Sequence, residues 1–160
     1  MALIFETENF FVDAFDKPHV DRDDGGHITI APKMRVPDRQ HLPPKLAIQL
    51  IKLTCLVGEA MAIAMNKRGV DIGRINYQDN GNWLVFEPEG PYLLYHLYGR
   101  AKSAKYQKYG EAVYMPLREK NPEYYSKFKS LKEGDVIEIR KEIERLLKTE
   151  KYKDSNWGLS

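Results

Sequence analysis

Residues 92–98 read YLLYHLY, and the imidazole of His96 is the group in this stretch best suited to chemistry. Near neutral pH an imidazole can donate a hydrogen bond to a phosphate oxygen or act as a general acid or base. In a strand, alternation would place His96 on one face with Tyr92, Leu94 and Tyr98, and would leave Leu93, Tyr95 and Leu97 for a core face. The mixed face suits either a half-exposed sheet surface or a concave surface that binds a ligand.

The elements that must position His96 are predicted to form one α+β unit. Strand-like composition and alternation occur at 9–15, 27–32, 70–78, 82–88 and 91–101. Between the second and third of these, residues 43–68 carry apolar side chains at helical spacing, begin with two prolines and are followed by Gly69. We therefore expect an antiparallel sheet covered by one long helix of about residues 43–68, whose apolar face belongs to the core rather than to a cofactor groove.

Residues beyond the last strand differ in composition. The stretch from 100 to 130 interleaves Lys with Tyr and Phe, as surfaces for single-stranded nucleic acid do, but interspersed acids favour a solvated face with aromatic anchors. VIEIRKEIERLLKTEKY, residues 136–152, predicts an amphipathic helix. We expect a domain of residues 1–104 and a helical C-terminal extension of residues 105–160 that packs on the core or on a partner.

Composition excludes several classes of protein. The formal charge of +2 in 160 residues is not that of a dedicated nucleic-acid binder, so nucleic acid is not an expected partner. The single cysteine, Cys55, rules out an internal disulfide, and no Cys/His spacing indicates a metal site. The N-terminus has no leader pattern, and no stretch approaches about 20 apolar residues. We expect a cytoplasmic protein with no membrane partner and no cofactor.

Two segments carry a resemblance to a known family. Residues 26–33 read GHITIAPK, residues 92–100 read YLLYHLYGR, and one long helix separates them. This arrangement resembles the histidine triad (HIT) family, in which three histidines alternate with apolar residues on one strand. The resemblance covers about residues 5–104 and places Tyr92, Leu94 and His96 in the three histidine positions. It implies a HIT-like sheet, usually a homodimer, that binds a nucleotide by its base, ribose and phosphate.

The resemblance implies an altered active site. In the family the middle histidine attacks the α-phosphate and forms a nucleotidyl-enzyme intermediate, and Leu94 has no nucleophilic atom. His96 matches the third histidine, which supports phosphate binding, and Glu87 and Glu89 stand where relatives hold phosphate with polar residues. Arg100 lies in the Gly-Arg ending of the strand, with Tyr98 before it on the face of His96.

Other candidate ligand residues come from the same comparison. Asp13 falls where the family has an acidic residue that accepts hydrogen bonds from ribose hydroxyls, although a turn-capping role fits equally. Either Asn76 or Asn80 matches an asparagine near the phosphate, and Asn80 with Gly81 also makes a good hairpin turn. His27 opens the second strand and lies either near a pocket rim or in an exposed position.

Three functions follow from these residues. The first is a HIT-like protein that binds a nucleotide or other small phosphate ligand without the histidine nucleophile. The second is a hydrolase of nucleoside phosphates or dinucleoside polyphosphates, with His96 as the base that activates water. The third is a dimeric interaction protein without catalysis, whose pocket is filled by Tyr92, Leu94 and Tyr98.

Overall fold

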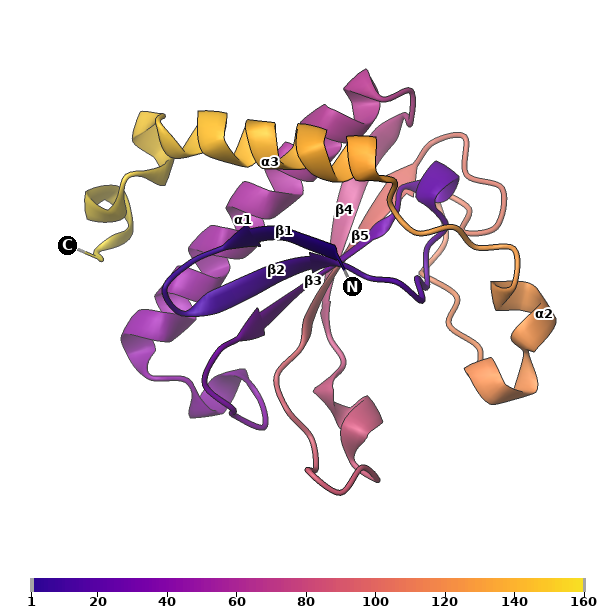
Figure 1. Ribbon diagram of the computed structural model, residues 1–160, viewed down its shortest axis with the longest axis horizontal. Coiled ribbons are helices and arrows are strands. Elements are labelled where there is room, and N and C mark those ends of the chain that lie inside the picture. Colours follow the sequence, from indigo (N-terminus) through magenta and orange to yellow (C-terminus); the bar gives the residue numbers. More distant parts are fainter. Residues whose placement is uncertain (1, 160) are drawn as a thin grey trace.

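The structure, a computed structural model, describes residues 2–159. Five strands form one antiparallel sheet in the order β1-β2-β3-β5-β4 (Figure 1). The strands are β1 (Ala2–Glu6), β2 (Phe10–Ala14), β3 (His27–Pro32), β4 (Ile72–Asp79) and β5 (Tyr95–Ala101). β3 and β5, which carry the two segments resembling the HIT family, are therefore neighbours at the centre of the sheet.

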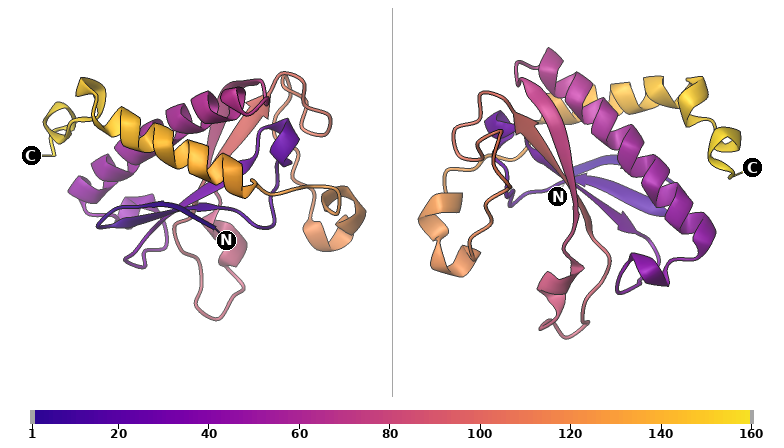
Figure 2. Two further views of the ribbon diagram at one scale, coloured as in Figure 1. Left: turned by 45° about the horizontal axis from the view of Figure 1, so that its top comes forward. Right: turned by 180° about the vertical axis from the view of Figure 1, so that it is seen from behind.

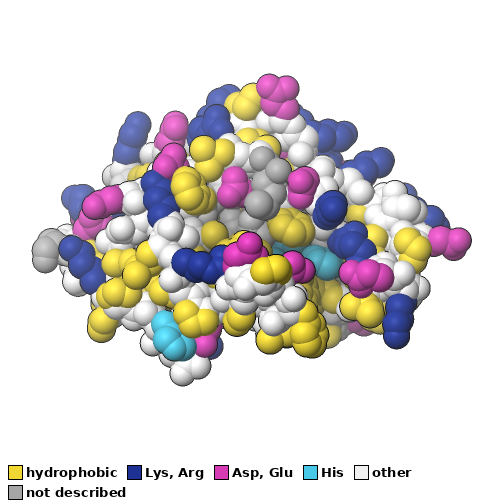
Figure 3. Space-filling view, turned by 60° about the horizontal axis from the view of Figure 1, so that its bottom comes forward, with side chains coloured by type: hydrophobic (Ala, Val, Ile, Leu, Met, Phe, Trp, Pro, Cys, Tyr) yellow, Lys and Arg dark blue, Asp and Glu magenta, His cyan; other side chains and the backbone are white. Residues whose placement is uncertain are grey.

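The helices divide the molecule into a packed side and a loop-covered side. The α-helices are α1 (Pro44–Lys67), α2 (Pro122–Tyr125) and α3 (Glu133–Leu147). Short 3-10 turns are η1 (Arg22–Asp24), η2 (Arg39–His41), η3 (Gly81–Leu84), η4 (Arg118–Lys120), η5 (Glu150–Tyr152) and η6 (Asp154–Trp157). α1 runs along one face of the sheet, and α3 crosses α1 (Figure 2). The other face is covered by loops. On the side of the molecule drawn in Figure 3, histidine shows only in small patches among hydrophobic and charged side chains.

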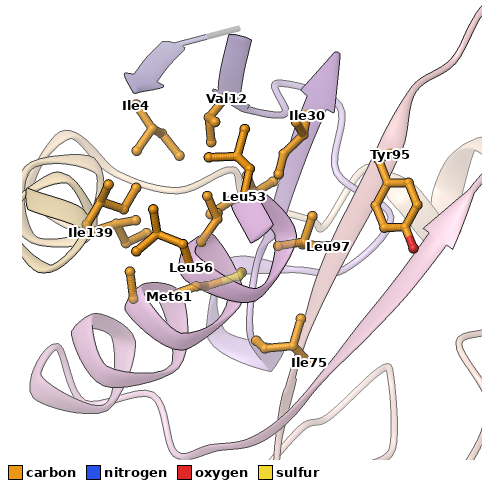
Figure 4. Close-up of a cluster of buried hydrophobic side chains, with 14 of the residues drawn as sticks. Ile4, Val12, Ile30, Leu53, Leu56, Met61, Ile75, Tyr95, Leu97 and Ile139 are labelled. Atoms are coloured by element: carbon orange, nitrogen blue, oxygen red, sulfur yellow. The ribbon is translucent and has the colours of Figure 1, made fainter. Parts of the chain in front are cut away.

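The core lies between the sheet and the helices (Figure 4). Fully or almost fully buried side chains come from the strands, from α1 and from α3, among them Val12, Ile30, Leu97, Leu56 and Ile139. Burying such a side chain contributes about 1.5–3 kcal/mol relative to leaving it exposed. Because α3 shares this cluster with the sheet, the C-terminal segment packs on the core; a domain boundary near residue 104 stays a prediction.

α1 begins and ends where the sequence predicts. Pro44 occupies its first turn, where a missing N–H costs nothing. Gly69 follows its C-terminus with φ of +82°, a conformation that strains other residues, and Val70 N–H donates to Met65 O at 2.9 Å. The helix and the sheet therefore meet through a tight, glycine-dependent turn.

Buried charge fixes the start of α3. The Asp135 carboxylate is inaccessible to solvent and accepts from Arg22 at 2.9 Å (Nε) and 2.7 Å (Nη2), and from Arg68 Nε at 3.0 Å. Burial alone would raise the pKa of Asp135, but the Arg22 guanidinium and the other donors lower it to about 2. These bonds join α3 to η1 and to the C-terminus of α1.

The predicted α+β class, the long helix and the helical C-terminal extension are confirmed. The strand predicted at 82–88 is wrong, because β4 and β5 already pair up to Asp79 and Tyr95 and the residues between them form η3 and a loop. β1 was not among the predicted strands. It pairs with β2 as an edge strand of the sheet, and its Ile4 is buried.

The expectation that no stretch is long and apolar enough to cross a membrane is also wrong. An 18-residue window of α1 has a mean hydropathy of 1.7, and 44 % of it is buried inside the protein. The helix is apolar on more than one side because it packs against both the sheet and α3. Length and composition alone do not distinguish such a core helix from a membrane span.

Candidate functional site

The sheet face opposite α1 gathers most of the predicted site residues. The register places Asp13 opposite Thr29 and Thr29 opposite His96. One step along, His27 lies opposite Tyr98, and Tyr98 opposite Asn76. Directly opposed residues share a face, so strands distant in sequence bring these side chains together.

Three histidines form a chain of hydrogen bonds on this face. The backbone N–H of His19 donates to His27 Nδ1 at 3.2 Å, so the proton of the neutral His27 ring lies on Nε2. That Nε2 is 2.9 Å from His96 Nδ1, which must then accept. His96 consequently carries its proton on Nε2, a buried atom without a hydrogen-bond partner in the described part of the chain. This tautomer, assigned from the bonding pattern, makes His96 a donor.

Burial keeps all three rings neutral. Desolvation lowers the pKa of His96 to about 3 and that of His19 to about 4. The pKa of His27 also falls well below its ordinary value, because the ring is fully buried and lies near His96. A desolvated imidazole resists protonation since its cation would lose water without gaining a counter-charge. At neutral pH the chain therefore ends in an uncharged N–H donor.

Tyr98 and Asn80 extend the buried polar face. Asn80 Nδ2 donates to Tyr98 Oη at 3.1 Å, and both side chains are buried. Burial raises the pKa of Tyr98, so its hydroxyl stays protonated. Both candidate asparagines therefore reach this face, because Asn76 lies opposite Tyr98 in the register and Asn80 donates to the Tyr98 hydroxyl.

The side chains of Arg100 and Asn76 are hydrogen-bonded to each other. Arg100 Nη1 donates to Asn76 Oδ1 at 2.6 Å, and its Nη2 donates to the carbonyl oxygens of Lys108 and Glu111, each at 2.7 Å. Arg100 is only 3 % exposed. Its guanidinium is engaged in anchoring the loop after β5.

The remaining predicted residues lie at the margins. Tyr92 and Leu94 precede β5 and are half-buried, so the strand alternation does not reach them. The Arg35 guanidinium stacks 5.0 Å from the Tyr92 ring centroid and donates to the carbonyls of Glu89 and Gly90. Asp13 is half-buried, and desolvation raises its pKa.

Trp83 of η3 covers the histidine chain. Its ring centroid lies 4.9 Å from that of His19 and 5.5 Å from that of His96. Beside it is a hollow of about 500 Å³ lined by Trp83, Phe86, His19, Arg118 and neighbouring residues. His96 is entirely inaccessible beneath this cover.

The segment after β5 forms a second cover over the histidine face, and several hydrogen bonds hold it in place. Asp24 accepts the backbone N–H groups of Lys105, Tyr106 and Gln107, each at 2.7 Å. The buried Gln107 side chain exchanges hydrogen bonds with the backbone of Tyr114 and also donates to His19 O at 2.9 Å. These contacts hold the segment after β5 against the histidine face.

Removing the Trp83 ring should open the way to His96. In Trp83→Ala we expect diethyl pyrocarbonate to modify His96 several-fold faster, measured by mass spectrometry of the peptide, at a stability cost of about 2 kcal/mol because the ring is half-exposed. Phe86→Ala is the matched control, since Phe86 is 97 % exposed on the same loop. Equal modification rates in the two variants would show that Trp83 does not cover His96.

Sequence reasoning missed three residues that complete this site, Trp83, Asp24 and Gln107. Trp83 carries no spacing signal, because it reaches the site from the connection between β4 and β5. Asp24 accepts backbone N–H groups from residues more than 80 positions away in the sequence, and Gln107 bonds to the backbone of Tyr114 within its own loop. No local sequence pattern reveals either contact. Among residues 2–159 no group of three or more His, Cys, Asp or Glu side chains is placed to hold a metal ion.

Comparisons with known proteins agree with this fold. No family model and no curated protein matches the sequence. A histidine triad nucleotide-binding protein from Sulfolobus tokodaii is similar in structure, with a TM-score of 0.59, 19 % identity and coverage of 91 % of this chain and 85 % of that one. A HIT-like protein from Bartonella henselae gives a TM-score of 0.56 at 13 % identity, covering 88 % and 85 %.

A zinc-bound histidine triad family protein from Mycobacterium smegmatis gives a TM-score of 0.55 at 18 % identity, covering 90 % of this chain and 84 % of that one. In each case the similarity extends over most of both chains. Sequence identities this low show that the fold is shared, and they do not show which residues form a site. The protein therefore has the α+β fold of histidine triad proteins, as the two sequence segments predicted.

Proposed function

We propose that the protein binds a nucleotide, or another small phosphate ligand, on the face of His96 and does not form a covalent nucleotidyl intermediate. The observation that carries the proposal is the buried, unpartnered Nε2–H of His96. A buried donor left without a partner costs about 1–3 kcal/mol, which a ligand oxygen would recover. A phosphate oxygen is a suitable acceptor because bonds to charged groups are the stronger ones.

The absence of a nucleophile at Leu94 supports the non-covalent part of the proposal. A nucleotidyl intermediate requires a nitrogen that attacks phosphorus, and the Leu94 side chain has none. His96 does not replace it, because Nδ1 already accepts from His27 and Nε2 carries the proton. The same tautomer disfavours His96 as a base that activates water, so we rank the hydrolase as the second candidate function.

A homodimer is part of the proposal. β4 is an edge strand, and next to it the exposed apolar side chains of Tyr77 on β4 and Ile51 on α1, each 45 % exposed, present a surface for a second copy. Light scattering of the purified protein should give twice the mass of the chain. Ile51→Glu should reduce the measured mass to that of one chain.

We place the protein in the cytoplasm, in keeping with its single free cysteine.

Ligand binding can be tested by thermal shift and calorimetry with AMP, ADP, ATP, GMP and dinucleoside polyphosphates. A ligand at 100 times its Kd should stabilise the protein by about 2.7 kcal/mol. His96→Ala should weaken binding roughly tenfold to a hundredfold, because a bond to a charged oxygen is lost. His41→Ala is the control, since His41 is exposed on η2.

Each alternative function predicts a different result. Turnover that disappears in His96→Ala would favour the hydrolase. No response to any nucleotide, with loss of assembly when the exposed Ile137 of α3 is changed to Glu, would favour the interaction protein. Restoring histidines through Tyr92→His with Leu94→His should yield nucleotidyl hydrolysis if only the nucleophile is missing.

A further inference from the structure

The lysines between residues 102 and 129 differ from most others in the chain. Elsewhere, six lysines lie within ion-pair distance of a carboxylate, namely Lys33, Lys52, Lys67, Lys141, Lys151 and Lys153. Within residues 2–159, no carboxylate lies at that distance from any lysine of the segment 102–129. The near-neutral charge of the whole chain therefore conceals a local group of unpaired cations.

The fold gathers several of these lysines around exposed tyrosines. Lys105, Tyr106, Lys127 and Lys129 line a hollow of about 420 Å³. A Cβ placed on Gly73 of β4 would lie 2.6 Å from Tyr109 Oη and 2.9 Å from Lys102 Cε, so these two side chains lie together over the sheet edge. We name the six residues Lys102, Lys105, Tyr106, Tyr109, Lys127 and Lys129 the lysine surface.

Acidic residues also line the hollow, but most of their charge is directed inward. Asp24 accepts the backbone of 105–107, and Asp21 accepts Lys129 N–H at 2.6 Å; both are at most 4 % exposed. The exposed Asp23 is paired with Arg22 at 2.9 Å. The buried carboxylates thus position the two segments that carry the surface. Asp23 attracts Lys129 and Asp71 attracts Lys102, but neither carboxylate lies within ion-pair distance of these ammonium groups.

The exposed tyrosines indicate which kind of anion the lysine surface would bind. Tyr106 is 39 % exposed and Tyr109 is 40 % exposed, and Tyr106 is supported from one side by the Phe128 ring at 5.3 Å. A partly exposed, supported ring offers a flat face on which a base can stack, while spaced ammonium groups contact phosphates. A lipid surface or an acidic protein would use the charges but has no bases for the rings.

We propose that the lysine surface binds single-stranded nucleic acid without sequence preference. The sequence did not predict nucleic acid as a partner because interspersed acids balance the lysines in number. In the structure the lysines of the hollow are exposed, whereas two of its three aspartates, Asp21 and Asp24, are buried. This hollow shares no lining residue with the hollow beside Trp83. The proposal is therefore independent of the nucleotide site and stands or falls separately.

Fluorescence anisotropy with a fluorescein-labelled 20-nucleotide single strand of mixed sequence tests the proposal. Binding at 50 mM salt should weaken about 50-fold at 200 mM, the slope expected for roughly four phosphate contacts. Lys105→Glu with Lys129→Glu should lower affinity at least about tenfold and flatten that slope. Tyr106→Ala should lower affinity about fivefold, whereas Tyr106→Phe should retain it.

The matched control is Lys45→Glu with Lys148→Glu, which changes the net charge equally at exposed lysines at the start of α1 and the end of α3. Its affinity should stay within about twofold of the parent. An equal loss in this control, or no binding at 50 mM salt, would overturn the proposal. So would tighter binding to phosphatidylserine vesicles than to the oligonucleotide, or displacement of the oligonucleotide by AMP, which would assign it to the site of His96.

Discussion

Lowering the pH from 6.5 to 5 should remove about 3–5 kcal/mol from the free energy of unfolding, because His19, His27 and His96 stay neutral in the native state while the unfolded chain takes up protons. Their pKa values lie below 6.5 in the folded protein, at about 4 for His19 and about 3 for His96, through burial. The unfolded state therefore binds more protons throughout this window. Stability must rise with pH between about 3 and 6.5 and be lost as the pH falls.

Urea unfolding at pH 7.5, 6.5, 5.5 and 5.0 measures this effect. Buried carboxylates such as Asp135, with a pKa of about 2, add a loss only below about pH 4, so the chosen window isolates the histidines. His96→Gln should flatten the dependence because one proton-linked group is removed. The exposed His41, changed to Gln, should leave the slope intact. Stability that is constant from pH 7.5 to 5 would mean that the histidines are not buried as described.

Removing the Asp24 carboxylate should have an effect of similar size. In Asp24→Ala the backbone N–H groups of Lys105, Tyr106 and Gln107 lose their acceptor. The bond to Gln107 is buried and the other two are partly buried, and a buried unpaired donor costs about 1–3 kcal/mol. We expect a loss of about 3 kcal/mol or more in thermal unfolding. Residues 105–115 should also become the first site of limited proteolysis, since the cover over the histidine face is released.

Asp23→Ala is the matched control for Asp24. Asp23 is the adjacent residue, its side chain is 56 % exposed, and its ion pair with Arg22 lies at the surface. Such pairs contribute about 1 kcal/mol or less. If Asp23→Ala and Asp24→Ala destabilise the protein equally, the three backbone bonds to Asp24 are not what holds the cover.

The two predictions bear on function because both concern the cover of His96. A donor that is neutral from pH 5 upward should bind a phosphate ligand with little dependence on its own protonation. Release of the second cover in Asp24→Ala would also disturb the lysine surface, since the same backbone presents Lys105 and Tyr106. Stability and nucleic-acid binding should therefore fall together in that variant.

The sequence by itself determined the elements whose signals are local. α1 follows from apolar spacing over more than six turns, with proline at one end and glycine at the other, and β3 follows from alternation closed by Pro32. The order of these elements, with GHITIAPK and YLLYHLYGR on either side of the helix, also indicated the fold. Signals of this kind survive because propensity and burial act in the same direction along a continuous segment.

Only the tertiary structure decided what surrounds His96. Residues 82–88 are as strand-like in composition as β5, yet β4 and β5 pair directly with each other and leave these residues in the connection between them. They form η3 and a loop, and they place Trp83 over the site. The tautomer of His96 depends on a backbone N–H that reaches it through His27. Likewise, whether a lysine is paired depends on carboxylates brought from other segments. Hydrogen bonds and ion pairs are short-range contacts between parts of the chain distant in sequence, so their partners are set by the fold and not by spacing.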